Sequence, residues 1–467
     1  MTRQYGDLGN GSEVDTSVSL AGRVMRMRRQ GGLYFADLYD QEGKIQLLLE
    51  KGALGDEYAL LDLIDLGDYL GVKGTPYRTR RGELSVHVRD LQVLTKTLQP
   101  PPAKWEGLRD PELVYRLRSD YFATTPEARE IIRKRSEVTR TVRAFLDNEG
   151  FLEIETPLLQ PVYGGASAKP FKTFVNALDR EFYLSISPEL YLKRLIAGGF
   201  EKVYTICKNF RNEGIDRTHN PEFTMMECYA AYEDYNHMMD LTERLYEAVF
   251  KAVNGSLTIE YGNDASPLGR VQLDFTRPWR RAKYLDLIKE HSGVNVAEMS
   301  EKELQEYVAS GRLGSGFYQE VLPREKASEW TWGELCEGLF SHYVERNLVQ
   351  PTFVMDFPAE STPLCKVHRE DSRLIERFEP LVYGFEIGNA YSELNDPIIQ
   401  RYLLEEQARK AERGDEEAHQ MDGDFLRAIE LGIPPTGGLG LGIDRMAMLA
   451  TGATSIRDVI AFPLMRT

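Results

Sequence analysis

The sequence has few cysteines and lacks any long apolar run. Its 467 residues include four cysteines, none in a CxxC pair: Cys207, Cys228, Cys336 and Cys365. This spacing argues against a disulfide framework and a zinc site, and it suits a reducing cytoplasm. No apolar run approaches the roughly 18 residues of a transmembrane helix, and the N-terminal segment has no apolar core like that of a signal peptide. We therefore expect a cytoplasmic protein with no membrane partner.

The sequence also lacks an excess of basic residues. It contains 57 Lys+Arg against 73 Asp+Glu, a net charge of −16. Taken globally, this charge argues against nucleic acid, because phosphate neutralisation requires clustered Lys and Arg, and we expect no DNA partner. The acidity is uneven: residues 1–106 hold 14 Lys+Arg and 15 Asp+Glu, whereas the remainder holds 43 and 58. The global charge therefore does not exclude RNA binding by the near-neutral N-terminal segment.

The N-terminal segment is patterned as a small β-barrel. Residues 18–96 contain about five short apolar or alternating stretches, separated by glycine-containing turns. This pattern favours an OB-fold. The following Gln99-Pro100-Pro101-Pro102 is a stiff break, and we place a domain boundary there, between 1–104 and 105–467.

The remainder reads as mixed helix and strand, so the predicted fold class is α+β. Thr125-Pro126-Glu127 predicts a helix start, and Gly150 its end. The further expected elements are a strand from 151 to Pro157, a strand–loop–strand over 203–231, helices over 285–350, two strands in 378–396, and a glycine-rich strand entering a helix over 437–452. The charged stretch 401–430 is most simply a solvated helical surface.

The strand–loop–strand contains the first candidate site. Alternate side chains share a face of a strand, so Phe223, Met225, Glu227 and Tyr229 point the same way. An edge strand with its Glu in water would also explain this pattern. The preceding loop holds Arg211, whose guanidinium suits a polyphosphate, although an ordinary polar hairpin loop would contain arginine too.

Two later segments add candidate chemistry. Glu379 and Glu386 are acids in an apolar context, and they are either Mg²⁺ ligands or surface carboxylates. The stretch Gly437–Arg445 is neither a Walker A sequence nor GxGxxG. Its glycines would admit a nucleotide close to the backbone, but tight strand–helix packing explains them equally well.

Together these segments resemble the three signature motifs of class II aminoacyl-tRNA synthetases. FLEIETPLL resembles motif 1, FRNEGIDRTHNPEF with TMMECY resembles motif 2, and GLGLGIDRMAML resembles motif 3. The resemblance is closest to the lysyl-tRNA synthetases, through GGASAKPF, SPELYLKRL, PTFVMDFP and EIGNAYSELND, and it covers about 18–467. It implies an N-terminal OB-fold anticodon-binding domain, a class II catalytic domain built on an antiparallel sheet, and a homodimer formed through motif 1. The implied substrates are L-lysine, ATP and tRNA(Lys), with Mg²⁺ as cofactor.

The resemblance also implies roles for individual residues. The catalytic residues would be Arg211 and Arg445. ATP would be bound by Arg211, Glu213, His219, Asn220, Phe223, Glu379, Glu386 and Arg445, with Glu379 and Glu386 as metal ligands. Lysine would be bound by Gly165, Glu189, Arg211, Glu227, Tyr229, Asn389, Tyr391 and Glu393. The anticodon would be contacted by Arg28, Arg29, Phe35, Gln46 and Glu83.

Three alternatives stay open at this point. Aspartyl- and asparaginyl-tRNA synthetases share the barrel and the motifs, but a pocket for a short acid would need to be cationic. A non-enzymatic RNA-binding paralogue would not need an intact Arg211 and Arg445. A paralogue that lysylates a protein would generally lack the barrel. Motif 2 also departs from the bacterial pattern, because Thr218 stands where an Arg is usual, and a phosphate contact would then pass to Arg217.

Overall fold

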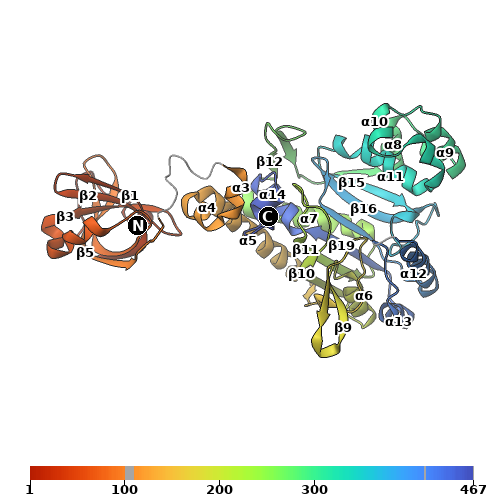
Figure 1. Cartoon of the computed structure of the whole chain (residues 1–467), viewed down its shortest axis with the longest axis horizontal. Coiled ribbons are helices and arrows are strands. Elements are labelled where there is room, and N and C mark those ends of the chain that lie inside the picture. Colours follow the sequence, from red (N-terminus) through yellow and green to blue (C-terminus); the bar gives the residue numbers. More distant parts are fainter. Residues whose placement is uncertain (100–109, 415–416, 466–467) are drawn as a thin grey trace. The chain divides into compact units, whose positions relative to one another are not determined.

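The computed structural model describes residues 1–99, 110–414 and 417–465 (Figure 1). The chain divides into two compact units, Met1–Pro126 and Glu127–Thr467. Each unit is described by itself below. The boundary predicted between residues 104 and 105 lies outside the described residues.

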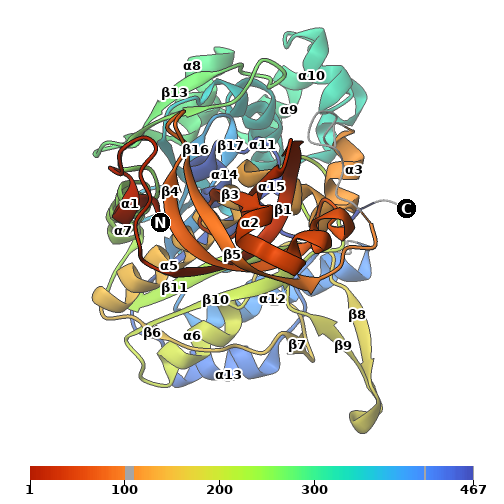
Figure 2. The same ribbon diagram turned by 90° about the vertical axis from the view of Figure 1, so that its left-hand side faces the viewer.

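The N-terminal unit contains a closed five-stranded barrel, as the sequence predicts (Figure 2). The strand order is β1-β2-β3-β5-β4. The strands are β1 (Val18–Gln30), β2 (Leu33–Tyr39), β3 (Lys44–Glu50), β4 (Tyr69–Arg78) and β5 (Leu84–Thr95). The described helices are α1 (Thr2–Tyr5), α2 (Lys51–Leu54), the 3₁₀ helix η1 (Gly55–Leu63), α3 (Pro111–Arg116) and α4 (Arg118–Thr124).

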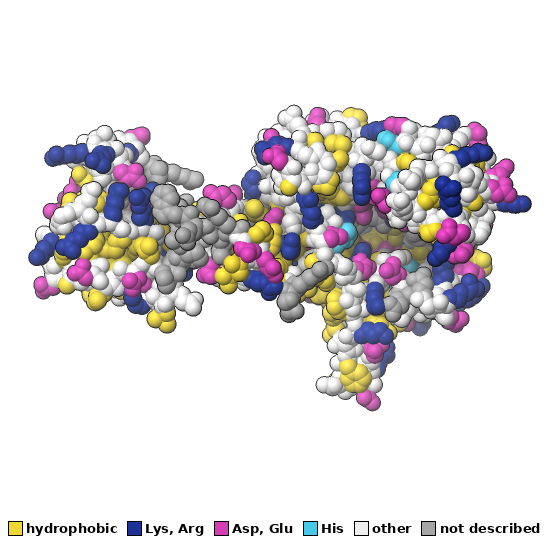
Figure 3. All heavy atoms as spheres, turned by 45° about the horizontal axis from the view of Figure 1, so that its top comes forward, with side chains coloured by type: hydrophobic (Ala, Val, Ile, Leu, Met, Phe, Trp, Pro, Cys, Tyr) yellow, Lys and Arg dark blue, Asp and Glu magenta, His cyan; other side chains and the backbone are white. Residues whose placement is uncertain are grey.

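Strand alternation builds the barrel interior. Val24, Ala36, Leu47, Leu70 and Val86 are each fully buried, one from each strand. The neighbouring outward side chains are left for solvent or a ligand. On the face seen in Figure 3, Lys and Arg side chains lie beside Asp, Glu and hydrophobic ones, in keeping with the near-neutral charge of this segment.

The C-terminal unit is built on one large sheet. In its described part, nine strands pair in the order β14-β15-β16-β18-β19-β11-β10-β6, with β17 beside β16. Pairing is antiparallel except at the two edges, β14–β15 and β10–β6. The strands are β6 (Leu152–Glu153), β10 (Lys202–Phe210), β11 (Glu222–Ala231), β14 (Arg280–Lys283), β15 (Thr352–Pro358), β16 (Leu374–Val382), β17 (Phe385–Glu386), β18 (Gly388–Ser392) and β19 (Thr436–Gly442).

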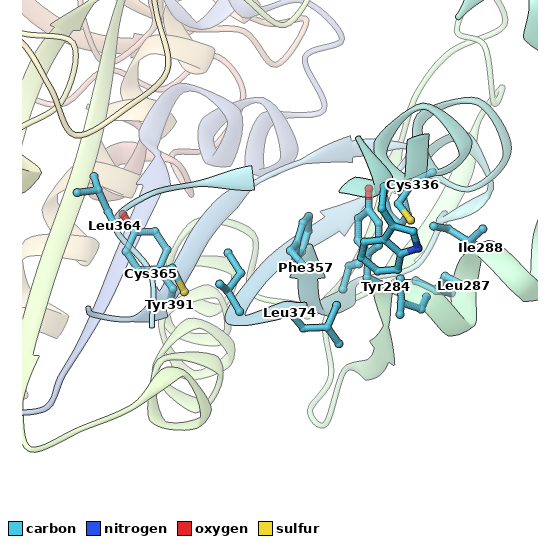
Figure 4. Packing of buried hydrophobic residues seen from close by; sticks show 14 of the residues in the cluster. Tyr284, Leu287, Ile288, Cys336, Phe357, Leu364, Cys365, Leu374 and Tyr391 are labelled. Atoms are coloured by element: carbon cyan, nitrogen blue, oxygen red, sulfur yellow. The ribbon is translucent and has the colours of Figure 1, made fainter. Parts of the chain in front are cut away.

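Helices cover both faces of this sheet. Tyr204 and Cys228 point into a core with α5, α7 and α14, whereas their neighbours Val203 and Tyr229 point into a second core with α6, α8, α11 and α13. Figure 4 follows the second core from Tyr284, Leu287 and Ile288 toward Cys365 and Tyr391. The helices are α5 (Pro126–Asn148), α6 (Glu189–Ala197), α7 (Tyr235–Asn254), α8 (Tyr284–Ser292), α9 (Glu301–Ala309), α10 (Ser315–Glu320), α11 (Trp332–Tyr343), α12 (Pro397–Glu412), α13 (Gly423–Leu431), α14 (Ile443–Thr451) and α15 (Ile456–Val459).

Smaller elements complete the unit. A hairpin of β8 and β9 stands clear of the large sheet in both ribbon views (Figures 1 and 2). The remaining strands are β7 (Leu159–Gln160), β8 (Lys172–Val175), β9 (Arg180–Leu184), β12 (Thr258–Tyr261) and β13 (Val271–Asp274). The 3₁₀ helices are η2 (Asn176–Leu178), η3 (Val296–Glu298), η4 (Arg324–Glu329), η5 (Glu345–Asn347) and η6 (Ala359–Ser361).

Most predicted elements are confirmed, and two need correction. The strand expected from 151 to Pro157 is only Leu152–Glu153, because Ile154 makes the last hydrogen bond to β10 before the chain leaves the sheet. The stretch 401–430 is not a simple solvated surface: Leu404, Phe425 and Ile429 are buried in the second core. Within the described ranges, no helix combines the length and apolarity that crossing a membrane requires.

Candidate active site

One cavity of about 350 Å³ opens on the face of the large sheet that carries Tyr229. It lies where the strands of motifs 2 and 3 meet β18, with β11 pairing β19 and β19 pairing β18. All residues expected to bind ATP or lysine line it: Gly165, Glu189, Arg211, Glu213, His219, Asn220, Phe223, Glu227, Tyr229, Glu379, Glu386, Asn389, Tyr391, Glu393 and Arg445. The fold therefore brings together segments that are up to 280 positions apart in sequence, from Gly165 to Arg445.

One end of the cavity holds three buried carboxylates. Glu189, Glu227 and Glu393 are 4%, 4% and 2% exposed. Glu227 accepts hydrogen bonds from the Ser187 hydroxyl at 2.9 Å and the Tyr229 hydroxyl at 3.0 Å. Glu189 accepts one from the Tyr391 hydroxyl at 2.6 Å. The Glu393 carboxylate pairs with the Lys193 ammonium but receives no other hydrogen bond, so it has lone pairs left for a cationic ligand.

The negative charges of these buried carboxylates repel one another. Burial, followed by the Glu189 carboxylate, raises the pKa of Glu227 to about 8, against the lowering effect of its two hydroxyl donors. Burial also raises the pKa of Glu393, against the lowering effect of the Lys193 ammonium. A dry pocket with this charge excess favours a ligand that brings ammonium groups.

Two glycines give the carboxylates their space. Gly438 on β19 faces Glu393 and Tyr229: a methyl group there would overlap the Glu393 carboxylate and approach the Tyr229 ring to 2.7 Å. Gly165 has φ +86°, which favours glycine, and a methyl group there would come within 2.8 Å of the Ser187 hydroxyl and 2.9 Å of Glu189 Cβ. The absence of a side chain at these two positions therefore leaves room for the carboxylates. This need for space explains the two glycines more specifically than close backbone packing does.

The other end of the cavity combines an arginine with an aromatic ring. The Arg211 guanidinium lies 5.2 Å from the centre of the Phe223 ring, and its buried Nε has no hydrogen-bond acceptor. Burial lowers the pKa of Arg211, partly offset by Glu213 and Glu386. A guanidinium whose Nε has no acceptor, beside a half-buried aromatic ring, suits an anion attached to a planar base.

One buried carboxylate fixes motif 3 to motif 2 and to helix α5. Asp444, 2% exposed, accepts hydrogen bonds from the Thr224 amide at 2.7 Å and from Arg135 of α5 at 2.7 Å. The next residue, Arg445, donates to the Glu386 carbonyl at 2.7 Å and lies 3.1 Å from His219 Nε2. These bonds hold Arg445 at the mouth of the cavity.

Glu379 and Glu386 suit a divalent cation. They lie on neighbouring strands, and burial followed by repulsion from Glu386 and other acids raises the pKa of Glu379 to about 7, although the Arg377 guanidinium opposes this effect. A metal ion would relieve this repulsion. Among the described side chains no group of three His, Cys, Asp or Glu converges on one point. Two carboxylates are a typical protein contribution to Mg²⁺ when phosphates supply the other oxygens.

The residues expected to contact an anticodon lie in the N-terminal unit. Arg28 and Phe35 are paired across β1 and β2, with the guanidinium 5.2 Å from the ring centre, and Arg29 stacks similarly on Tyr34 at 5.3 Å. Gln46 is only 6% exposed and accepts a hydrogen bond from the Ser85 hydroxyl at 3.1 Å. Glu83 is exposed between β4 and β5, 3.8 Å from Lys44. The stacked Arg28–Phe35 pair is the feature best placed to receive an unpaired base.

Two residues that line the cavity, and one that pairs with its carboxylates, were not predicted from the sequence. Lys193 lies between Glu189 and Glu393. Arg377 donates hydrogen bonds to Asn389, at 2.9 Å, and to Glu379. His419 lines the cavity, although it belongs to the stretch 401–430 that the sequence predicts to be a solvated surface. The four-residue spacing of Glu189 and Lys193 on one helix is the sequence feature that could have indicated the Lys193 ion pair. Arg217 donates to the Thr454 carbonyl at 3.3 Å, so it is engaged away from the cavity lining.

Comparison with known families agrees with this geometry. The family model described as "tRNA synthetases class II (D, K and N)" matches residues 111–466. The model of an "OB-fold nucleic acid binding domain" matches residues 18–94. These two matches account for both units of the fold.

Individual relatives show to which group within this family the chain is similar. A lysine–tRNA ligase of Clostridium perfringens is 48% identical over 451 residues, covering 96% of this chain and 87% of the relative. Those of Syntrophomonas wolfei and Roseiflexus castenholzii are 49% and 50% identical, again over 96% of this chain and over 88% and 89% of the relatives. Identity at this level over nearly the whole of both chains, together with the class II site, shows that the chain belongs to the lysine–tRNA ligase family of class II aminoacyl-tRNA synthetases.

Proposed function

We propose that the protein activates L-lysine with ATP, forming lysyl-adenylate and pyrophosphate, and then transfers lysine to the terminal adenosine of tRNA(Lys). The observation that carries this proposal is the single cavity that joins three buried carboxylates at one end to Arg211 and Phe223 at the other. The first end suits an amino acid with two ammonium groups, and the second suits the α-phosphate and base of ATP.

The chemistry needs no side-chain nucleophile. The lysine carboxylate attacks the α-phosphorus and pyrophosphate leaves, so the protein contributes positioning and charge stabilisation. The unsatisfied Arg211 guanidinium is suited to hold the attacking carboxylate and the α-phosphate together and to stabilise the charge that develops at phosphorus. Phe223 would stack on the adenine, Glu213 and Asn220 would contact the base end, and Arg445 with His219 would receive the outer phosphates.

We propose Glu379 and Glu386 as the residues that hold Mg²⁺. When bound, the ion would neutralise phosphate charge and favour departure of pyrophosphate. Arg377 bonds both Glu379 and Asn389, so it would keep the metal ligand and the amino-acid pocket in a fixed relation.

The pocket favours lysine over the substrates of the related synthetases. Aspartate would place a carboxylate among Glu189, Glu227 and Glu393, and asparagine, with its α-ammonium alone, would leave one of them without a cation. An unpaired buried charge costs several kcal/mol. Gly165 and Glu189 would bind the α-amino group, and Glu227, Tyr229, Asn389, Tyr391 and Glu393 would surround the side chain.

We propose that the barrel reads the anticodon through Arg28, Arg29, Phe35, Gln46 and Glu83. Single-stranded RNA is recognised by stacking on aromatic rings and by contacts to base edges. The stacked Arg28–Phe35 pair supports this role most directly. Gln46 would have to exchange its bond with Ser85 for a base, which makes it a sensitive position for mutation.

We also propose a homodimer. Apolar side chains are exposed around motif 1 and on the β8–β9 hairpin: Leu152 at 50%, Leu159 at 50%, Phe174 at 56% and Leu178 at 59%. Such a patch, together with a projecting hairpin, suits burial against a second copy. Sedimentation should give a dimer; a stable monomer at micromolar concentration would refute this part of the proposal.

The four cysteines are all unpaired, which supports the expected reducing cytoplasm.

Ligand stabilisation and charging test the function. Lysine with ATP should raise the melting temperature, and aspartate with ATP should not, because only a bound ligand shifts the folding equilibrium. The protein should then charge tRNA(Lys), and an altered anticodon should weaken charging. Equal charging with altered anticodons would refute the role of Phe35 and Gln46 while leaving the activation step intact.

A further inference from the structure

A lysine of the protein is already bound among the acids of the amino-acid pocket. Lys193 of α6 is 1% exposed, and its ammonium lies 2.6 Å from Glu189 and also pairs with Glu393. The same ammonium lies 5.4 Å from the ring centre of Tyr391 and 5.9 Å from that of Phe425.

The groups nearest to this ammonium form a small set. The titratable groups that interact with it or with its two carboxylate partners are Glu189 from α6, Glu227 and Tyr229 from motif 2, Tyr391 of β18, Glu393 directly after β18, Cys365 before β16 and His419 before α13. Beyond them, Arg211 interacts with Glu227, and Arg377 and Glu376 interact with Cys365. The other titratable residues that line the cavity are Glu213, His219, Glu379, Glu386, Asp444 and Arg445. Burial raises the pKa values of Tyr229, Tyr391 and Cys365 well above their ordinary values, so these groups stay neutral. Burial, and then the Lys193 ammonium, lowers the pKa of His419 to about 4, so it also stays neutral at pH 7.

The remaining charges form a simple balance. When all three carboxyl groups are ionised, they face one fixed ammonium, which leaves an excess of two negative charges. In the empty pocket at pH 7, the raised pKa of Glu227, about 8, keeps that group mostly protonated. Lysine brings two ammonium groups, and its carboxylate would pair with Arg211 under the proposed function. An amino acid with one ammonium group would leave one buried carboxylate without a cation, which is unfavourable in a dry site.

We propose that Lys193 is a positioning and specificity-determining residue: it is a permanent counter-ion that orients Glu189 and Glu393 and sets the pocket's negative excess to the two charges that lysine supplies. This inference rests on the proposed function, since it assumes that lysine occupies the pocket. It differs from a purely structural role because it predicts a change in the number of protons that the lysine complex retains.

The protonation state of the lysine complex tests the proposal. In wild type, Lys193 and the two ammonium groups of lysine balance three carboxylates, so none of the three carboxyl groups needs a proton in the complex. In Lys193→Met, two ammonium groups face the same three carboxylates, so one carboxyl group should keep its proton in the complex at pH 7. Infrared difference spectroscopy of the full-length protein saturated with L-lysine should therefore show the C=O stretch of one more protonated carboxyl group in Lys193→Met than in wild type, and the KM for lysine should rise.

Three further variants separate charge from shape. Lys193→Arg keeps the charge and should give the wild-type carboxyl signal even if its KM rises. Lys302→Met removes an exposed lysine that also faces a glutamate four residues away, Glu306, and it should match wild type in both readouts. The double variant of Lys193→Met with Glu393→Gln removes one charge of each sign, so it should also give the wild-type carboxyl signal and remains informative if the single variant does not fold.

The outcomes distinguish the two proposals. If wild type does not bind lysine, the proposed function fails. If wild type binds lysine but the lysine complex of Lys193→Met holds no additional protonated carboxyl group, or that of Lys193→Arg holds as many as Lys193→Met, the counter-ion role is refuted while the function stands. An additional protonated carboxyl group in the double variant would refute it as well.

Discussion

Replacing Gly438 by alanine should damage lysine binding selectively. The new methyl group would overlap the Glu393 carboxylate and lie 2.7 and 3.0 Å from two carbons of the Tyr229 ring. Both neighbours belong to the buried end of the cavity, where β19 is fixed by β11 on one side and β18 on the other. The side chains must therefore move rather than the strand, and overpacking of this kind costs about 1–3 kcal/mol.

That cost should appear in the KM for lysine. A loss of about 1–3 kcal/mol corresponds to roughly 5- to 150-fold weaker binding. The KM for ATP should change little, because Arg211 and Phe223 lie at the other end of the cavity. Pyrophosphate-exchange kinetics with each substrate varied in turn would measure both values.

The same strand provides a matched control. A methyl group on Gly442 would meet its nearest neighbours, atoms of the Arg445 side chain, at an ordinary 3.7 Å. Gly442→Ala should therefore leave the KM for lysine near its wild-type value. An unchanged lysine KM in Gly438→Ala, or an equal rise in both variants, would refute the placement of the lysine pocket beside Gly438.

Three other predictions concern single interactions of the site. Because burial raises the pKa of Glu227 to about 8, its carboxylate forms only as the pH rises toward that value. The KM for lysine, measured in exchange assays from pH 6 to 9, should therefore fall about tenfold per pH unit up to about pH 8 and then level off. Glu227→Gln should not show this pH-dependent fall. Asp444→Ala leaves the Thr224 amide and Arg135 without their acceptor, and urea unfolding should show a loss of about 3–5 kcal/mol; a loss below about 1 kcal/mol would contradict the anchoring role. Phe223→Ala removes the proposed stacking surface and should raise the KM for ATP by the equivalent of about 1–3 kcal/mol, with the KM for lysine as the internal control.

The sequence predicted the barrel and the strands of motifs 2 and 3 because their signals are local. Alternation places Phe223, Glu227 and Tyr229 on one face, and the cavity lining confirms that they share it. Motif 1 was predicted less well. Its apolar residues suggest a strand that continues to Pro157, but only Leu152 and Glu153 pair with β10. Strand pairing depends on a neighbour that the local sequence does not reveal.

The electrostatic design of the pocket could not be predicted from the sequence alone. Lys193 follows Glu189 by four residues, and this spacing is common on solvated helix faces. Only the tertiary structure buries the pair and brings Glu393, 200 positions later in the chain, to the same ammonium. Likewise, the charged stretch 401–430 gave no reason to expect His419 in the cavity.

Lysine-dependent exchange of pyrophosphate into ATP is the most direct test of the central claim that this cavity activates lysine. It isolates the activation step from tRNA binding, so the barrel plays no part in the result. We predict exchange with L-lysine, ATP and Mg²⁺, and none with aspartate or asparagine in place of lysine. Absence of exchange with lysine, or equal exchange with aspartate, would contradict the account.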